Sequence, residues 1–235
     1  MIGAQALKLS WLPRLRRAGV APARARLDPA SVRRVQVGCG PHNLMQGWCN
    51  VDIRDFPGID AVMDVTKPWP WKGLDYVYGE HFLEHLELEG ALAFLCHAGR
   101  ALKPGGRIRL STPSLEWVMK THFTFTRKEP KKIVQQTLGT NRAFHGWGHH
   151  FLYSRVMLQW LLEQIGFTDI RFYDYGESED ANLRGIERHG KFTKAEGFPS
   201  VWIVEAARSE KEIAVPDSLR QHLDWNFSRY VRDGH

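Results

Sequence analysis

The sequence predicts an α/β fold built on a mostly parallel sheet. From about residue 33, strand-like and helix-like segments alternate, which is typical of parallel strands joined by helices. A glycine turn, Gly38-Cys39-Gly40, directly follows the first strand-like segment. The chain has 235 residues, 43% of them hydrophobic and 25% charged, which is enough for one domain with a sizeable core.

Seven short apolar runs are expected to form the strands of the sheet, since each has the length of a buried strand. They are residues 35–37, 48–53, 61–63, 74–78, 107–111, 167–173 and 200–206. Because Trp48 already begins the second run, any helix between the first two strands must be very short.

Helices are expected in two segments and in the tail, residues 211–235. Apolar residues three to five apart predict one helix over 82–102. Lys103-Pro104-Gly105-Gly106 ends it, because proline cannot continue a helix and glycine accepts a left-handed backbone. A second helix is expected over 154–165. Residues 112–150 are expected to be an irregular, aromatic and basic insertion that acts as a lid, since connections of that length are usually functional.

The excess positive charge lies in a leader, residues 1–32, which precedes the main domain at 33–210. Residues 1–27 hold six basic side chains and no acidic one, so the +6 net charge resides there and the remainder is neutral. A neutral main domain argues against nucleic acid as the partner. Three interpretations of the leader are open: a packed helix or disordered arm, a peripheral anchor on an anionic membrane, and a transit peptide.

The composition also indicates the compartment. Cys39, Cys49 and Cys96 are an odd number without a Cys-x-x-Cys pair, which predicts a reducing, cytoplasmic environment and no disulfide framework. The chain has no run of 18 or more apolar residues, so no membrane-spanning segment is expected.

The strongest local signal is the glycine turn, together with an acidic residue after the second strand. Glycines let the backbone turn sharply and approach a ligand without a Cβ in the way. Asp52, at the end of the second strand, can accept hydrogen bonds from a ribose diol. The pattern departs from the dinucleotide fingerprint, because Asn43 stands where a third glycine is usual. On these residues alone, a glycine turn beside an exposed aspartate is an open interpretation.

Further motifs follow in order along the chain. Asp64 ends the third run, Glu80-His81-Phe82-Leu83-Glu84-His85-Leu86 follows the fourth, and Leu102-Lys103-Pro104-Gly105-Gly106 precedes the fifth. In this combination the chain resembles the class I S-adenosylmethionine-dependent methyltransferases, in particular the methyltransferase-domain group with a Leu-Glu-His run after strand four. The resemblance implies a Rossmann-like fold, a mostly parallel seven-stranded sheet with helices on both faces, and S-adenosyl-L-methionine as the cofactor.

The resemblance also implies a role for each matching residue. The glycine turn matches the loop that lies against the methionine and ribose parts of the cofactor, and Asp52 matches the acid on the ribose hydroxyls. Asp64, with Val65 beside it, matches the acid near the adenine amino group. Glu80 and His81 match the start of the loop that faces the methionine end and the reaction centre.

Histidines are the candidate catalytic residues, because an acceptor hydroxyl benefits from a nearby base and histidine titrates near neutral pH. His81 is expected to face the site and His85 to support the loop, while a simple cap at the helix start is the alternative for both. His149 and His150 are expected to position or deprotonate the acceptor, with a packed surface cluster as the alternative. No metal is expected, because the histidine spacing matches no zinc pattern.

The acceptor is expected to be an oxygen of a small molecule or of a glycan sugar. The segment between Trp117 and Trp147 supplies aromatic side chains, which suit sugar faces among other ligands. A nucleic-acid acceptor is the first alternative, and the basic residues 120–132 favour it. The others are a non-catalytic S-adenosylmethionine-binding scaffold and an NAD-dependent oxidoreductase. The sequence leaves the oligomeric state open.

Overall fold

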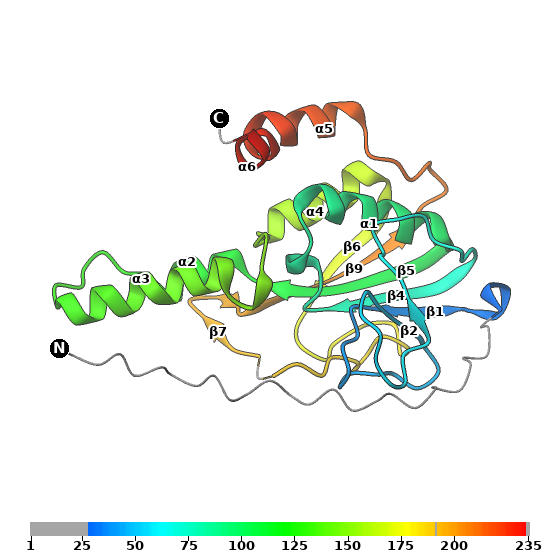
Figure 1. Cartoon of the computed structure of the whole chain (residues 1–235), viewed down its shortest axis with the longest axis horizontal. Helices are drawn as coiled ribbons and strands as arrows, with labels where there is room; N and C mark the ends of the chain where they lie inside the picture. The colour runs from blue at the N-terminus through cyan, green and yellow to red at the C-terminus, as the bar shows by residue number, and fades with distance from the viewer. Residues whose placement is uncertain (1–27, 191, 234–235) are drawn as a thin grey trace, which may run out of the picture.

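The computed structural model describes residues 28–190 and 192–233, which form a seven-stranded sheet flanked by helices (Figure 1). In spatial order the strands are β3 (Ala61–Val62), β2 (Cys49–Asp52), β1 (Arg34–Val37), β4 (Leu74–Glu80), β5 (Leu102–Pro113), β9 (Val201–Arg208) and β6 (Phe167–Tyr173). Adjacent strands are parallel, except that β9 runs antiparallel to β5 and β6. The predicted Rossmann-like, mostly parallel sheet is confirmed. The interpretations of residues 1–27 lie outside the described residues.

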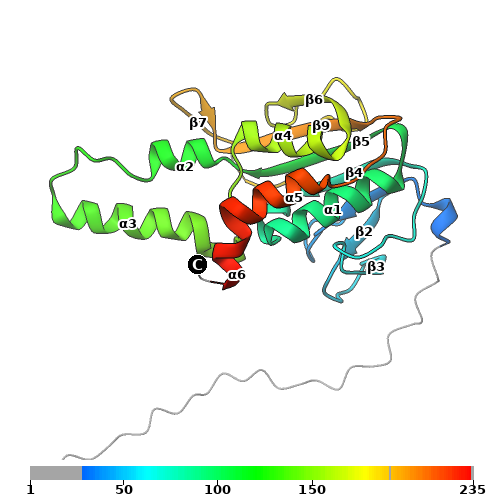
Figure 2. The same ribbon diagram turned by 90° about the horizontal axis from the view of Figure 1, so that it is seen from above.

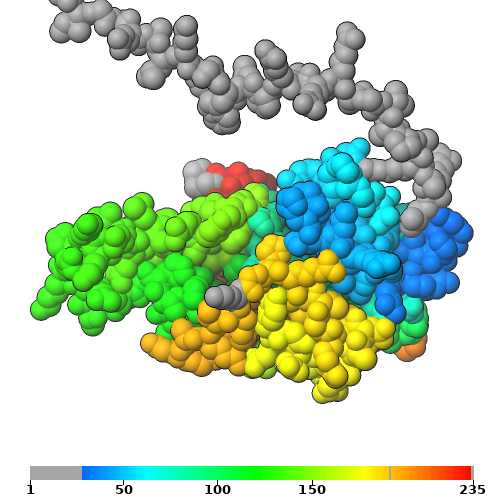
Figure 3. Space-filling view, turned by 90° about the horizontal axis from the view of Figure 1, so that it is seen from below, coloured from blue at the N-terminus to red at the C-terminus, as the bar shows by residue number. Residues whose placement is uncertain are grey.

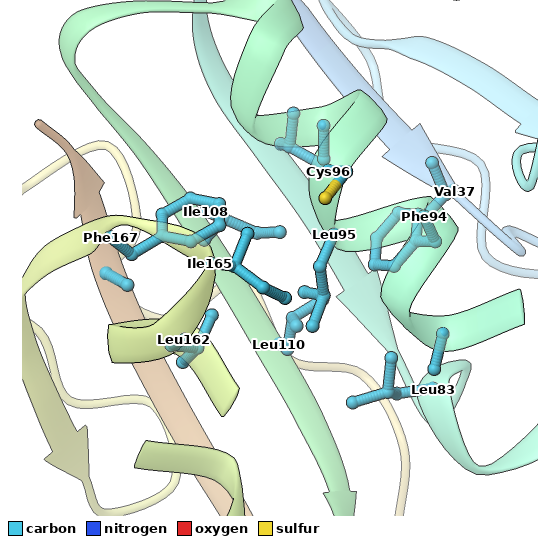
Figure 4. Close-up of a cluster of buried hydrophobic side chains, with 14 of the residues drawn as sticks. Val37, Leu83, Phe94, Leu95, Cys96, Ile108, Leu110, Leu162, Ile165 and Phe167 are labelled. Atoms are coloured by element: carbon cyan, nitrogen blue, oxygen red, sulfur yellow. The ribbon is translucent and has the colours of Figure 1, made fainter. Parts of the chain in front are cut away.

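One face of the sheet carries the main helices, α1 (Leu88–Ala101), α4 (Arg155–Ile165) and α5 (Asp217–Leu223). In Figure 1, α1 and α4 lie next to the sheet and α5 lies above these two helices; Figure 2 shows the three from above. The apolar side chains of α1 and α4 meet those of β5 in a buried core, part of which Figure 4 shows. Full burial of one such side chain contributes about 1.5–3 kcal/mol, so this core holds the strand ends in place.

Helix α4 matches its prediction because its ends carry strong local signals. The Ser154 side chain accepts a hydrogen bond from the Met157 backbone N–H and caps the first turn. Gly166, with φ 111°, ends the helix in a left-handed conformation. Between these caps, Leu158, Leu161, Leu162 and Ile165 are buried.

The other face of the sheet is covered by loops where helices had been expected. Successive β4 residues alternate between faces, so Val77 packs with the helices while Tyr78 points the other way. There Tyr78 forms a second core with Met45, Trp48 and Leu183, which come from the β1–β2 connection and the loop after β6. Figure 3 shows this face, with the blue and yellow segments side by side. The β1–β2 connection holds only turns, because it is too short for a helix and its return.

The helix predicted over 82–102 is wrong at its start. Leu83–His85 forms a 3-10 turn, η2, and α1 begins only at Leu88. The Glu84 backbone carbonyl accepts hydrogen bonds from the N–H groups of His150 (2.7 Å) and Phe151 (3.3 Å). Because this carbonyl is bonded to a distant segment, the local helix is interrupted.

The segment predicted to be irregular, 112–150, instead contains two helices, α2 (Leu115–Thr121) and α3 (Pro130–His145). They project beyond the end of the sheet (Figure 2). Ser114 caps α2, and Pro130 occupies the first turn of α3. Ala143 is the buried residue of α3, so this helix lacks the apolar stripe by which helices are recognised in sequence.

Several short elements complete the described part of the chain. They are the 3-10 turns η1 (Pro29–Ser31) and η3 (Gly146–Gly148), the hairpin of β7 (Lys194–Ala195) with β8 (Phe198–Pro199), the π-helical turn η4 (Asp224–Ser228) and α6 (Arg229–Asp233). In the tail, Leu219 and Leu223 of α5 are buried in the main core. Within 28–190 and 192–233, every helix is too short or too polar to cross a membrane.

Candidate active site

A cavity of about 570 Å³, here the first cavity, opens at the carboxyl ends of β1, β2 and β4. Ligands of parallel sheets bind outside these strand ends. The volume lies within the range of roughly 300–1,000 Å³ that is typical of ligand pockets. Every residue that the sequence placed at the cofactor lines this cavity: Gly38, Cys39, Gly40, Asp52, Asp64, Val65, Glu80 and His81.

The glycine turn after β1 has a backbone that glycine adopts without strain. Gly38 has φ 61° and Gly40 has φ 57°. The Phe82 side chain packs on Gly38, where an added Cβ would overlap the ring edge and lie 3.0 Å from Phe82 Cγ. An added Cβ at Gly40 would meet nothing within 4 Å. Phe82 therefore fills the space beside Gly38, whereas the space beside Gly40 is free for a ligand.

The Asp52 carboxylate is held by the glycine turn and by its own loop. Its Oδ2 accepts a hydrogen bond from the Gly40 N–H (3.0 Å), and its Oδ1 accepts one from the Arg54 N–H (3.0 Å). The residue is 6% exposed. Each carboxylate oxygen can accept a further hydrogen bond, so the group is oriented to receive the hydroxyls of a ligand.

Asp64 lines the same cavity and lies after β3. Its Oδ1 accepts hydrogen bonds from the Thr66 N–H (3.0 Å) and the Thr66 hydroxyl (2.7 Å). These bonds lower the pKa of the Asp64 carboxyl below its usual value. Among the described residues no donor is bonded to Oδ2, which leaves that oxygen available to a ligand donor such as an amino group.

Glu80 ends β4 and fixes the loop that follows β6 over the cavity. Its carboxylate accepts hydrogen bonds from the backbone N–H groups of Arg188 (2.8 Å) and His189 (2.9 Å). The His189 ring consequently lies 5.2 Å from the His81 ring, centroid to centroid. Glu80 is thus both a wall of the cavity and the anchor of this loop.

His81 is held in a strained conformation by two partners, Ser111 and Glu84. Its φ is 46°, and its backbone N–H donates to the Ser111 carbonyl (3.0 Å). Its Nδ1 is 3.0 Å from Oε1 of the fully buried Glu84. Burial opposes the charged imidazole, but the hydrogen bond to Glu84 and the charges of Glu84 and Glu80 raise the pKa of His81 above its usual value. Left-handed backbone at a non-glycine residue persists where the surroundings impose it, commonly at functional sites.

A second cavity, of about 480 Å³, adjoins the first. It lies between the η2 turn and the insertion, and aromatic and imidazole side chains form much of its wall: His81, His85, Trp117, His122, Trp147, His149 and His189. A smaller third cavity, of about 230 Å³, lies beside Tyr175 and Phe192. His81 and His189 line all three cavities, so the three meet at these two rings.

Sequence comparison identifies the family. Residues 11–171 match a family model described as a methyltransferase domain, which is more than half of the chain. The chain belongs to the methyltransferase-domain family. Together with its sheet order, this makes it a class I S-adenosylmethionine-dependent methyltransferase. No curated protein sequence matches this methyltransferase.

Solved structures with similar folds include several methyltransferases. One is a SAM-dependent methyltransferase from Archaeoglobus fulgidus (20% identity, 76% of this chain and 87% of that chain, TM-score 0.46). Another is an S-adenosylmethionine-dependent methyltransferase from Mesorhizobium loti (18% identity, 77% and 92%, TM-score 0.46). A third is the CurJ carbon methyltransferase (14% identity, 77% and 50%, TM-score 0.44), of which this methyltransferase spans only half the length.

The first cavity of the methyltransferase fits S-adenosylmethionine, the cofactor of this enzyme class. The turn at Gly40 leaves room for a ligand against the backbone. Asp52 presents a fixed carboxylate to the same space. Asp64 adds a second carboxylate with an oxygen that has no partner among the described residues. One carboxylate bonded to the glycine turn and a second one on the same cavity suit the ribose and adenine of one adenosine.

The two histidines predicted from the insertion have different positions in the methyltransferase. His149 lines the second cavity, and its Nδ1 donates to the Ala143 carbonyl (2.9 Å). His150 lines none of the three cavities, and its Nδ1 is 3.1 Å from the exposed Glu87 carboxylate. Of these two histidines, only His149 lines a cavity among the three described, because adjacent residues of an extended segment point to opposite sides.

The loop after β6 supplies a site residue that the sequence patterns do not single out. Its His189 lines all three cavities. A buried ion pair fastens the loop: Arg109 of β5 is fully buried and pairs with Glu187 and with Glu205. Arg109 stands between the buried apolar residues Ile108 and Leu110, and this was the sequence signal for the pair, since a buried charge requires a partner.

Proposed function

We propose that this methyltransferase transfers a methyl group to an oxygen atom of a small molecule or glycan sugar bound in the second cavity. The observation that carries the proposal is that His81 and His189 line both the first and the second cavity. A methyl donor in one cavity and an acceptor in the other would therefore meet at these rings. Trp117 and Trp147 give the second cavity flat apolar surfaces that suit a ring-shaped acceptor.

The residues of the first cavity would hold the cofactor in a defined order. The backbone of the glycine turn lies against its methionine and ribose parts, and Asp52 accepts hydrogen bonds from the ribose hydroxyls. Asp64, with Val65 beside it, receives the adenine amino group. Glu80 and His81 border the methionine end of the cofactor, and His81 also lines the second cavity. This order directs the reactive end of the cofactor toward the acceptor.

S-adenosylmethionine supplies an electrophilic methyl group, whose bond to sulfur breaks as the bond to the acceptor oxygen forms, so that S-adenosylhomocysteine is released. The protein has to align the acceptor with that methyl group and exclude water. The walls of the second cavity do both, because they enclose the acceptor on the side opposite the cofactor.

His81 is the residue positioned to take the proton that the acceptor hydroxyl loses. Its Nδ1 is engaged by Glu84, so its Nε2 is the nitrogen free to face the acceptor. The buried Glu84 carboxylate fixes the ring and stabilises the imidazolium that forms. His149 borders the acceptor from the insertion side. We assign no catalytic role to His150.

Titration with S-adenosylhomocysteine, followed by an acceptor screen, tests the proposal. We expect tight binding, and transfer of radiolabelled methyl to the hydroxyl of a monosaccharide, small alcohol or phenol in the panel. His81→Ala should reduce turnover on that acceptor at least about 100-fold, the usual contribution of a general base, with nearly unchanged S-adenosylhomocysteine affinity.

His145→Ala is the matched control, since this exposed histidine lines none of the three cavities. Its turnover should equal that of the unmodified enzyme. Full turnover by His81→Ala would refute the assigned role. Methylation of RNA or DNA alone, or binding without turnover on any acceptor, would refute the acceptor class.

A further inference from the structure

Three side chains at the edge of the second cavity bring together two imidazoles and a buried carboxylate, a combination that could hold a metal ion. Glu84 and His85 lie on the η2 turn, and His149 comes from the segment after α3. One nitrogen or oxygen atom from each lies within 4.8 Å of the others. All three residues line the second cavity. The set therefore joins two segments at the place where the acceptor is expected.

Both histidines present a free nitrogen with a defined tautomer. His149 Nδ1 donates to the Ala143 carbonyl (2.9 Å), and His85 Nδ1 donates to the Gly148 carbonyl (3.2 Å). A carbonyl only accepts, so each Nδ1 carries the hydrogen and each Nε2 has a lone pair. Metal-ligating histidines characteristically donate their other ring N–H to a carbonyl or carboxylate, which fixes the ring. Both rings show this arrangement.

The carboxylate of Glu84 supplies a second, independent observation. The residue is fully buried, and its Oε1 is engaged by His81. Its Oε2 is buried without any hydrogen-bond partner among the described residues. A carboxylate oxygen left unpartnered in the interior is unfavourable unless another group neutralises it. A cation beside Oε2 would remove this penalty.

We propose that Glu84, His85 and His149 bind a divalent transition-metal ion, Zn²⁺ by preference. Two imidazole nitrogens and one carboxylate oxygen are the donor set of open zinc sites, in which a further position remains for water or substrate. Imidazole ligands favour zinc and the other late first-row transition metals over magnesium, which selects oxygen ligands. The insertion and the η2 turn are then tied together by the ion, because each contributes ligands.

The ion acts on the acceptor, a role that rests on the proposed function. All three ligands line the second cavity, so the open coordination position faces the acceptor. Coordination of the acceptor oxygen polarises its O–H bond and fixes the oxygen in place. The Glu84 carboxylate links this site to His81, since its Oε1 holds the His81 ring while Oε2 binds the ion.

Metal titration of the full-length protein, freed of metal with a chelator, tests the inference directly. We expect one Zn²⁺ per chain by calorimetry and the visible absorption bands of low-coordinate Co²⁺ when cobalt replaces it. His85→Asn and His149→Asn should each weaken Zn²⁺ binding by about 100-fold or more, beyond the 10–100-fold typical of the outer-sphere partners. Glu84→Gln, which keeps the volume of the buried side chain, should do the same.

His150→Asn is the matched control, because this neighbouring histidine pairs with Glu87 outside the cavities. Its Zn²⁺ affinity and Co²⁺ spectrum should equal those of the unmodified protein. Thermal unfolding of each variant separates loss of a ligand from loss of the fold.

The inference is overturned if the folded, unmodified protein binds neither Zn²⁺ nor Co²⁺, if it prefers Mg²⁺, or if both histidine variants keep full affinity. A parallel titration with S-adenosylhomocysteine separates the two proposals. Cofactor binding without metal binding refutes the metal site alone, whereas absence of cofactor binding refutes the proposed function.

Discussion

Replacement of Gly38 by alanine tests how the glycine turn shapes the first cavity. Gly38 and Gly40 share a left-handed backbone, with φ 61° and 57°, but their surroundings differ. A Cβ at Gly38 would stand 3.0 Å from Phe82 Cγ and 3.2 Å from Phe82 Cβ. Rotation of the ring does not move Phe82 Cβ or Cγ away from these contacts, so the whole Phe82 side chain must move. A Cβ at Gly40 meets nothing within 4 Å.

The expected magnitudes follow from these contacts. At either position, alanine in the left-handed conformation lowers the free energy of unfolding by about 1–2 kcal/mol. Gly38→Ala adds an overpacking penalty of about 1–3 kcal/mol, because Phe82 also packs edge-on against Phe94 with ring centroids 5.2 Å apart. Gly38→Ala should therefore be about 1–3 kcal/mol less stable than Gly40→Ala.

Urea unfolding of both variants measures this difference, and calorimetry with S-adenosylhomocysteine measures its consequence for the cavity that Phe82 lines. The double variant Gly38→Ala/Phe82→Ala should lose less free energy of unfolding than the sum of the losses in the two single variants, because the overlap between the new Cβ and the ring is gone. Equal stabilities of Gly38→Ala and Gly40→Ala, or strictly additive losses in the double variant, would refute the reasoning.

Three further predictions concern the buried charges and thiols. Glu187→Ala should lower the free energy of unfolding by about 3–5 kcal/mol in urea, because it leaves Arg109 buried with one partner fewer. Glu179→Ala, which breaks an exposed pair with Arg171, should change it by at most about 1 kcal/mol; similar losses would contradict the assignment. Asp52→Asn should weaken S-adenosylhomocysteine binding about tenfold or more by calorimetry, since hydrogen bonds to a charged group are lost, and unchanged affinity would exclude Asp52 from the ribose site. Burial, the largest cause, and the charge of Asp60 raise the pKa of Cys49 from 9.0 to about 12. The folded state thus favours the neutral thiol. The contribution of this thiol to the free energy of unfolding is fully present below pH 9 and falls as the pH rises above 9, by about 1.4 kcal/mol at pH 10. Between pH 8 and pH 10, the free energy of unfolding of Cys49→Ala should therefore fall by about 1.4 kcal/mol less than that of the unmodified protein. An equal fall in both proteins would show that the thiol does not contribute.

The grouping of residues around the first cavity could be predicted because each lies at or just after the end of a strand. In a parallel sheet, strand ends of the same direction converge, so the glycine turn, Asp52 and Asp64 meet once the strands are recognised. The motif order, rather than any single residue, identified the class. Caps at Ser154 and Gly166 likewise made α4 predictable from local signals.

The remaining features depend on contacts between distant segments. The helix start at residue 82 is lost because the Glu84 carbonyl bonds to the 149–151 segment. His189 reaches the cavities because Glu80 and Arg109 fasten its loop. The Glu84, His85 and His149 set joins the η2 turn to the end of the insertion, more than 60 residues away, so no sequence spacing reveals it. Local patterns do not encode these pairings.

A crystal structure with S-adenosylhomocysteine bound tests the central claim most directly. We expect its adenosine in the 570 Å³ cavity, with the ribose hydroxyls on Asp52, the adenine beside Asp64 and the sulfur at the end bordered by His81. Adenosine bound anywhere else, or contacts that omit both carboxylates, would contradict the assignment of this cavity.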